Sequence, residues 1–194
     1  MKKFLAVLLV LICLTMTAQA AEKPVRIARL PIIFQTSSPD LNTCAELEVK
    51  IARAVHIPMN KTLKLAEYLP TKKSTQALTD IWKEIRAENE KARLAEAMRP
   101  LADKLDADIV VCPVLNRYSQ TVMMSGFYET IINSYVKTEM IVYDRRTDNL
   151  IDKKSSQYYH GDYIMTGTAA YLAKICFDKV INDSQLRQLI LAIR

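Results

Sequence analysis

The sequence has 194 residues, of which 25% are charged, and a formal net charge of +6. Its basic residues are scattered among acidic ones, and two of the positive charges come from Lys2 and Lys3. No basic run reaches the length of a nucleic-acid patch, so we expect no nucleic-acid partner. The mild positive balance leaves peripheral contact with an anionic membrane surface or polymer open.

The first 20 residues have the layout of a secretory signal peptide. A positive start is followed by an apolar run from Phe4 to Met16 and by the small-residue site Ala18-Gln19-Ala20. This run is too short for a comfortable membrane span of about 20 residues. We predict cleavage after Ala20, which leaves 21–194 as a single α/β domain, periplasmic or extracellular, without an integral membrane span.

Three cysteines remain after this cleavage, Cys44, Cys112 and Cys176, and each falls on an apolar face of its predicted element. An odd number in an oxidising compartment allows at most one internal bridge. We expect free buried thiols, which behave as small hydrophobes, and a Cys44–Cys176 bridge is the alternative. Lipidation at Cys13 is disfavoured because Ile12 occupies a position where a lipobox requires a small residue.

The mature chain begins with a predicted strand and a predicted helix. The strand, Val25–Phe34, is apolar on both faces apart from two arginines, which indicates a place inside a sheet. A helix from Leu41 to Val55 follows a Ser-Pro-Asp start signal. Its apolar residues recur at three- and four-residue spacing and form one buried stripe that includes Leu41 and Cys44.

The next segment alternates and then becomes helical. Lys61–Leu69 has leucines on one side and polar residues on the other, which predicts a half-buried strand. A helix capped by Ser74 or Thr75 follows. Its predicted buried face consists of Leu78, Ile81, Trp82 and Ile85. A second helical stripe continues over 94–105, and Pro100 within it should kink or restart the helix.

The stretch Asp108–Leu115 is apolar at almost every position, rich in valine, and too short for a typical helix. This pattern predicts a strand that is buried on both faces in the middle of the sheet. A separate polar-to-apolar strand is predicted at Asn116–Met124, followed by a turn at Ser125-Gly126.

Two more strands and two helices complete the chain. Phe127–Tyr143 is a long alternating strand, and Leu150–Tyr159 pairs back on it, with charged residues 152–154 that guard a sheet edge. Helices are predicted at 168–180 and 186–193. The fold class is therefore α/β (α+β): a single mixed sheet, with an antiparallel meander in its second half and helices packed on the sheet.

Three motifs resemble the bacterial envelope domains related to the amino-terminal domain of TolB, to CsgG and to LpoB. They are a strand with a Leu-Pro step at Arg29-Leu30-Pro31, a helix-to-strand junction at Asp106–Val111, and a hairpin at Tyr143–Leu150. Two glycines of the family pattern are replaced, by Asp106 at the junction and by Asn149 in the hairpin. The resemblance implies an envelope domain that binds other proteins, and it carries over no catalytic residue.

The sequence offers little support for catalysis. His160 lies in the polar-aromatic stretch Tyr158–Tyr163, and with Asp162 and a thiol it can be written as a nucleophile triad. A small hydrolase that uses His160 and Asp162 is therefore the main alternative function. Cys112, however, is expected in mid-strand, where burial raises a thiol pKa and blocks access.

Metal and cofactor sites also lack a sequence signal. The chain has no CxxC, HxH or HExxH spacing, so we expect no metal site. Only three glycines are present, which excludes a glycine-rich phosphate loop. We therefore expect no cofactor.

The remaining candidate is a cluster of aromatic and methionine side chains around Ser125-Gly126. At a hairpin tip such groups mark a contact with a partner or a membrane. The alternative is that they serve packing, with half of them pointing into the core. The candidate partner-binding residues are Met123, Met124, Phe127, Tyr128, Tyr159 and His160.

We thus expect a secreted or periplasmic, non-catalytic binding module for an envelope protein or polymer, as a monomer or weak oligomer. A carrier of a small apolar ligand is the third possibility.

Overall fold

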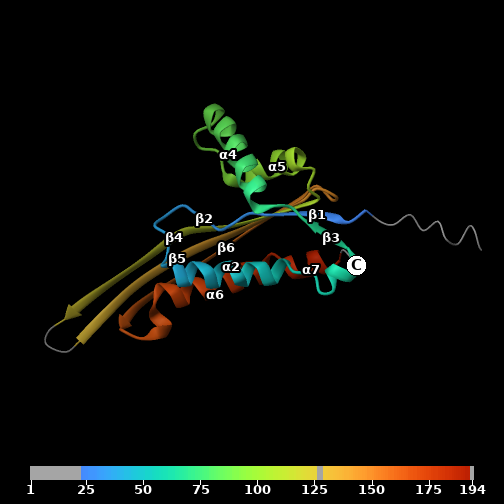
Figure 1. The fold of residues 1–194 in the computed structure, drawn as a ribbon. Coiled ribbons are helices and arrows are strands. Elements are labelled where there is room, and N and C mark those ends of the chain that lie inside the picture. Colours follow the sequence, from blue (N-terminus) through green and yellow to red (C-terminus); the bar gives the residue numbers. More distant parts are fainter. Residues whose placement is uncertain (1–22, 126–128, 193–194) are drawn as a thin grey trace, which may run out of the picture.

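The structure, a computed structural model, describes residues 23–125 and 129–192. They form a mixed six-stranded sheet with helices on both faces (Figure 1). The order across the sheet is β3 (Ala66–Tyr68), β1 (Val25–Arg29), β4 (Ile109–Ser125), β5 (Glu129–Asp144) and β6 (Asn149–Asp162), and β2 (Ile33–Phe34) also pairs with β4. The predicted fold class is confirmed. The predicted signal peptide lies outside the described residues.

Strand β4 is the centre of the sheet, as the apolar stretch predicted. Its first part, Ile109–Leu115, is buried at every position. Parallel strands β1 and β2 pair with it on one side, and antiparallel β5 pairs with it on the other. A strand with helices over both of its faces needs an apolar side chain at each position, which explains the continuous run of valine, isoleucine and leucine.

The predicted strand Val25–Phe34 is two strands. The register with β4 starts at Ile27, and the ladder is interrupted after Leu30, whose N–H still donates to the carbonyl of Val111 at 2.9 Å. Pro31 has no N–H to continue the ladder. The chain returns to β4 at Ile33 as β2.

Strands β4, β5 and β6 form a long antiparallel meander. Pairing between β4 and β5 runs from Ile109 to Ser125, with one irregularity between Leu115 and Arg117. The strand predicted separately at 116–124 is therefore the second half of β4. A bulge at Asn116 shifts the alternation of side chains between the two faces by one residue. In the sequence, this shift looks like a break between two strands. Gly126 of the predicted turn lies outside the described residues.

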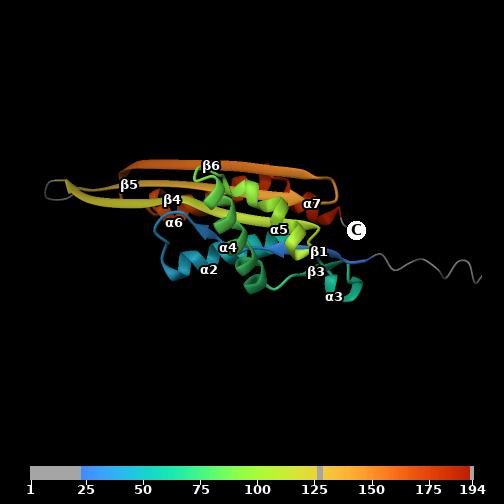
Figure 2. The same cartoon turned by 90° about the horizontal axis from the view of Figure 1, so that it is seen from above.

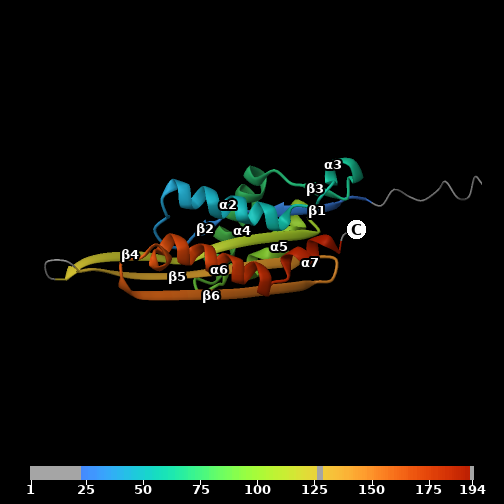
Figure 3. The same cartoon turned by 90° about the horizontal axis from the view of Figure 1, so that it is seen from below.

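One face of the sheet is covered by α2 (Leu41–Val55), α6 (Ala169–Asp183) and α7 (Leu186–Leu191) (Figure 3). Asp40 caps α2, as its carboxylate accepts a hydrogen bond from the Thr43 N–H at 3.0 Å. The prediction that Leu41 is buried is wrong. It is 88% exposed, because the buried stripe of the helix starts at Thr43 and continues through Leu47, and Leu41 lies off that stripe.

The other face is covered by α4 (Thr71–Glu88), the 3₁₀ helix η1 (Leu94–Ala97) and α5 (Met98–Leu105) (Figure 2). Helix α4 starts before the predicted cap, and Trp82 and Ile85 are only half-buried. Pro100 lies in the first turn of α5, where no intrahelical N–H is needed, so the predicted restart is confirmed. No helix within the described residues combines the length and apolar character of a membrane span.

The predicted strand at Lys61–Leu69 is largely wrong. A short helix, α3 (Asn60–Leu63), occupies its first half, and only β3 is extended. The side chain of Asn60 fixes this change, because its amide donates to the Ala66 carbonyl and accepts from the Ala66 N–H, each at 2.8 Å. The leucine alternation therefore spans two different backbone conformations.

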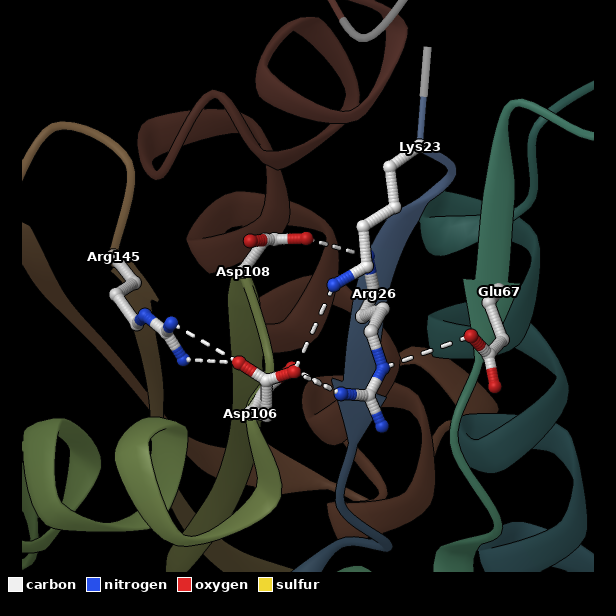
Figure 4. Close-up of polar contacts among 6 residues, drawn as sticks. All are labelled: Lys23, Arg26, Glu67, Asp106, Asp108 and Arg145. Carbon is white, nitrogen blue, oxygen red and sulfur yellow. Dashed lines mark hydrogen bonds and ion pairs between the residues drawn. The ribbon is translucent and has the colours of Figure 1, made fainter. Parts of the chain in front are cut away.

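The helix-to-strand junction 106–108 is fixed by charges (Figure 4). Asp106 ends α5 in the left-handed region, with φ of 49°. Its carboxylate accepts hydrogen bonds from Arg26 at 2.5 Å and from Arg145 at 3.1 Å, and lies 3.9 Å from the ammonium of Lys23. The Asp108 carboxylate accepts the backbone N–H of Arg26 at 2.8 Å. Asp106 thus adopts a backbone conformation that favours glycine and adds ion pairs.

Cys44, Cys112 and Cys176 are free thiols, so no Cys44–Cys176 bridge is present. Cys112 and Cys176 are fully buried, and Cys44, in the first turn of α2, is half-buried. Burial raises the pKa of each thiol, most strongly for Cys112 in mid-strand. A low thiolate fraction and restricted access make Cys112 and Cys176 poor nucleophiles.

Candidate binding surface on the distal arm

The meander extends beyond the helices as a three-stranded ribbon. We call its segments 117–125, 129–137 and 156–162 the distal arm. The hairpin end of β4 and β5 projects past α4 on one side of the sheet and past α6 on the other (Figures 1 and 2). An extension of this kind buries little on its own, so its side chains remain available for contacts.

The two faces of the distal arm differ in chemistry. Side chains alternate between the faces, and directly paired residues share a face. The face on the side of α4, called the α4 face, carries three paired rows, Arg117–Lys137–Ser156, Ser119–Tyr135–Tyr158 and Thr121–Asn133–His160. The opposite face, called the α6 face, carries Val122 and Met124 from β4.

Helix α6 covers only the inner part of the α6 face. Ile132 and Val136 are fully buried there, and the N–H of Ala169 at the start of α6 donates to the Gln120 side chain at 2.8 Å. The Tyr159 hydroxyl donates to the carbonyl of Asp162 at 3.0 Å, which fixes the end of β6. The α6 face therefore belongs to the core as far as Ile132 and is open beyond it.

An apolar patch lies at that open end. Met124 is 82% exposed and Val122 is 48% exposed. The Tyr163 N–H donates to the carbonyl of Thr130, the pairing partner of Met124, at 2.9 Å, which brings the end of β6 to the same place. Tyr163 and Met165 follow β6 and are 53% and 80% exposed. We call Val122, Met124, Tyr163 and Met165 the distal apolar patch.

The structure separates the residues that the sequence predicted as one site. Met123 and His160 lie on the α4 face, whereas Met124 and Tyr159 lie on the α6 face. Tyr159 is half-buried against the core. Phe127 and Tyr128 lie outside the described residues.

Two members of the distal apolar patch, Tyr163 and Met165, were missed by the sequence prediction. The signal was the tripeptide Tyr163-Ile164-Met165 in a segment otherwise taken as a loop.

A triad that uses Cys112 fails on distance. His160 and Asp162 share the exposed α4 face, but His160 pairs with Asn133 whereas Cys112 pairs with Ile141. Eight residues of β5 separate these two positions, which corresponds to about 27 Å. Cys112 therefore cannot act with His160 as the predicted triad requires, and the wider hydrolase alternative stays a prediction.

A groove of about 910 Å³ lies between α4 and the sheet. Apolar side chains such as Phe34 and Trp82 line it, together with the charged Glu139 and Lys154. The ammonium of Lys154 lies 3.3 Å from the Glu139 carboxylate, and Lys83, Arg86 and Arg93 also line the groove, so its charged groups are mainly cationic. Its place between helix and sheet is the one that the carrier hypothesis predicts, and that hypothesis stays a prediction.

Comparison with known proteins finds resemblance at the level of structure. No family model matches the sequence, and a search of curated proteins finds no match either. The hypothetical protein CT253 from Chlamydia trachomatis is 14% identical, with a TM-score of 0.47, over 87% of this chain and 99% of that one. Lipoprotein GNA1162 from Neisseria meningitidis is 15% identical, with a TM-score of 0.37, over 82% and 99%.

The LpoB C-terminal domain from Salmonella enterica is 10% identical, with a TM-score of 0.32, over 77% of this chain and 90% of that domain. The predicted resemblance to LpoB thus has a structural counterpart, whereas its TolB and CsgG parts stay predictions. With TM-scores below 0.5, these similarities carry no property of the other proteins over to this chain.

Proposed function

We propose that this chain is a non-catalytic binding module of the cell envelope that contacts another envelope protein through the distal apolar patch. The observation that carries the proposal is the exposure of Met124 near the end of a projecting arm and of Met165 in the turn that follows β6. Methionine side chains are flexible and polarisable, which suits a surface that packs against a partner. Exposed apolar side chains grouped in this way mark interaction sites.

The place of the patch in the fold supports this function. Val122 and Met124 extend the α6 face beyond Ile132, where the core ends, so a partner docked there would continue an apolar layer that already exists. Tyr163 adds an aromatic ring with a polar hydroxyl, a residue type enriched at protein interfaces. The signal-peptide layout of the first 20 residues supports export to the envelope.

Site-specific photo-cross-linking tests the proposal in the host cell. A photoreactive amino acid replaces Met124, and its cross-linked products are identified by mass spectrometry after irradiation. Replacement of Leu63 on α3 is the matched control, because Leu63 is also apolar and is 50% exposed. We expect one dominant protein partner for position 124 that is missing from position 63.

A second variant separates binding from folding. Met124→Ser combined with Met165→Ser should abolish capture of that partner and leave the melting temperature nearly unchanged, because both side chains are exposed. Identical products from positions 63 and 124 would contradict the proposal. Capture of lipid alone would contradict it as well.

A further inference from the structure

The α4 face of the distal arm presents a second surface, separate from the distal apolar patch. Its first row places Arg117 of β4 directly opposite Lys137 of β5. Both side chains are exposed, and neither forms an ion pair with a carboxylate of the described residues. Like charges in direct cross-strand pairs destabilise a sheet. This row therefore maintains a concentrated positive charge at a cost in stability.

The next row places two aromatic rings side by side. Tyr135 of β5 pairs with Tyr158 of the edge strand β6, and Tyr158 is 61% exposed. The guanidinium carbon of Arg117 lies 5.7 Å from the centre of the Tyr135 ring. This stacking orients the planar guanidinium and leaves its N–H groups free to bind an anion.

The third row supplies further polar groups. Asn133 pairs with His160 on β6 and with Thr121 on β4. Amide, imidazole and hydroxyl groups both donate and accept hydrogen bonds. Successive rows lie two residues apart along the strands, a step of about 7 Å. The surface thus offers charge, rings and polar groups in sequence along one sheet face, and the hairpin end of β4 and β5 extends past α4 in Figure 2.

We infer that the α4 face of the distal arm binds an anionic glycan, a polymer whose sugar residues carry carboxylates. Arg117 and Lys137 bind the carboxylates, and the exposed ring of Tyr158 packs against the apolar C–H face of a sugar. His160 and Asn133 bind hydroxyl groups of the next sugar. An extended polymer fits because the three rows follow one another along the same sheet face.

Charge and apolar character favour a glycan over a membrane. Met123 is 47% exposed on the α4 face, but the exposed apolar groups Val122 and Met124 lie on the opposite face, so the cationic face presents a single methionine to a lipid layer. The second surface is therefore independent of the protein contact proposed above, and either can fail without the other.

Binding of oligogalacturonate to the purified mature chain, measured by isothermal titration calorimetry, tests this inference. We expect binding that weakens as salt rises. Lys137→Gln should weaken it about tenfold, which is the usual effect of losing one charged hydrogen bond. Tyr158→Ala should also weaken it several-fold. Lys73→Gln, which removes an exposed cation from α4, should leave it unchanged.

Three further measurements make the result decisive. Lys137→Gln should keep or slightly raise the melting temperature, because it removes a like-charge pair while it weakens glycan binding. Equal binding of the methyl-esterified oligosaccharide would overturn the role of the cations. The third comparison uses inorganic polyphosphate and anionic phospholipid vesicles. If either binds as tightly as oligogalacturonate, and Tyr158→Ala does not weaken that binding, the surface is a general anion site and the glycan assignment is overturned.

Discussion

The ring of Tyr159 lies directly against Gly167, so that a Cβ added at Gly167 would fall 2.3 Å from a ring carbon. Glycine is needed there because the edge strand and the η2 turn (Met165–Gly167) touch at this point. We expect Gly167→Ala to lower the free energy of unfolding by about 1–3 kcal/mol, the usual cost of overpacking. Chemical denaturation followed by circular dichroism measures this.

The double variant Tyr159→Ala/Gly167→Ala identifies the cause. Once the ring is absent, the added methyl group at position 167 should cost almost nothing relative to Tyr159→Ala alone. An undiminished cost would assign the effect to the backbone of the turn and contradict the steric explanation.

Thr138 offers a stabilising substitution. Its hydroxyl is buried beneath α6 and has no hydrogen-bond partner within the described residues. Thr138→Val keeps the branched shape and removes the unpaired polar group, so we expect a gain of about 1 kcal/mol in the free energy of unfolding. Thermal unfolding of this variant, compared with exposed Thr79→Val, measures the gain. A loss of stability would mean that a bound water satisfies the hydroxyl.

The boundary between core and surface on the α6 face is also testable. Ile132 is fully buried, whereas Met124 is 82% exposed on the same face. Ile132→Ala should lower the free energy of unfolding by about 2–5 kcal/mol, and Met124→Ser should change it by less than about 0.5 kcal/mol. Urea titrations of both variants provide the comparison, and a large loss for Met124→Ser would place that residue in the core.

The Asp106 junction predicts a dependence on pH. The hydrogen bonds from Arg145, helped by the charge of Lys23, hold the pKa of Asp106 below its ordinary value of 3.8. A lowered folded-state pKa stabilises the fold above the unfolded value, and this stabilisation is lost as the pH falls through the folded value. The melting temperature of Asp106→Asn should therefore be lower than wild type at pH 7.

The same comparison below pH 3.8 completes the test. There the two melting temperatures should converge as the pH falls through the lowered folded-state pKa of Asp106, because the wild-type carboxyl becomes neutral over that range. Asp103→Asn on the same helix is the control, and it should leave the melting temperature nearly unchanged at both pH values. A wild-type advantage that persists at low pH would contradict the ionic explanation.

The cysteines should differ in reactivity. Cys44 is half-buried, whereas Cys112 and Cys176 are fully buried. Iodoacetamide should therefore label Cys44 first in the folded protein and label the other two only after urea unfolding. Mass spectrometry of the peptides measures the three rates. Equal labelling of Cys176 and Cys44 without urea would show that α6 opens readily.

The central strand could be predicted because its signal is local and continuous. Every residue from Ile109 to Leu115 is apolar because both faces are covered, and no other short element requires that pattern. The start of α2 could also be predicted, since Asp40 provides cap chemistry through its own side chain. Both features depend on residues that are close together in the sequence, so neither requires knowledge of the strand pairing.

The candidate surface could not be predicted in the same way. The single extra residue Asn116 decides which face each later residue of β4 occupies, and its bulge becomes visible only when β5 is paired. Met123 and Met124 thus fell on opposite faces although the sequence treated them as one cluster. Leu41 was misplaced because the buried stripe of α2 starts at the polar residue Thr43, which an apolar pattern does not mark.

The bulge at Asn116 also divides the long meander into an inner part, with β4 residues 109–115, and an outer ribbon, with β4 residues 117–125. The Asn116 amide donates to Gln35 and to Glu139, each at 3.1 Å, so the joint is anchored to the body on both sides. Each part keeps its own strand register. The outer ribbon leaves the core only beyond Ile132, so paired dipeptide insertions at that end should lengthen the ribbon and leave the pairing of Ile109–Leu115 unchanged.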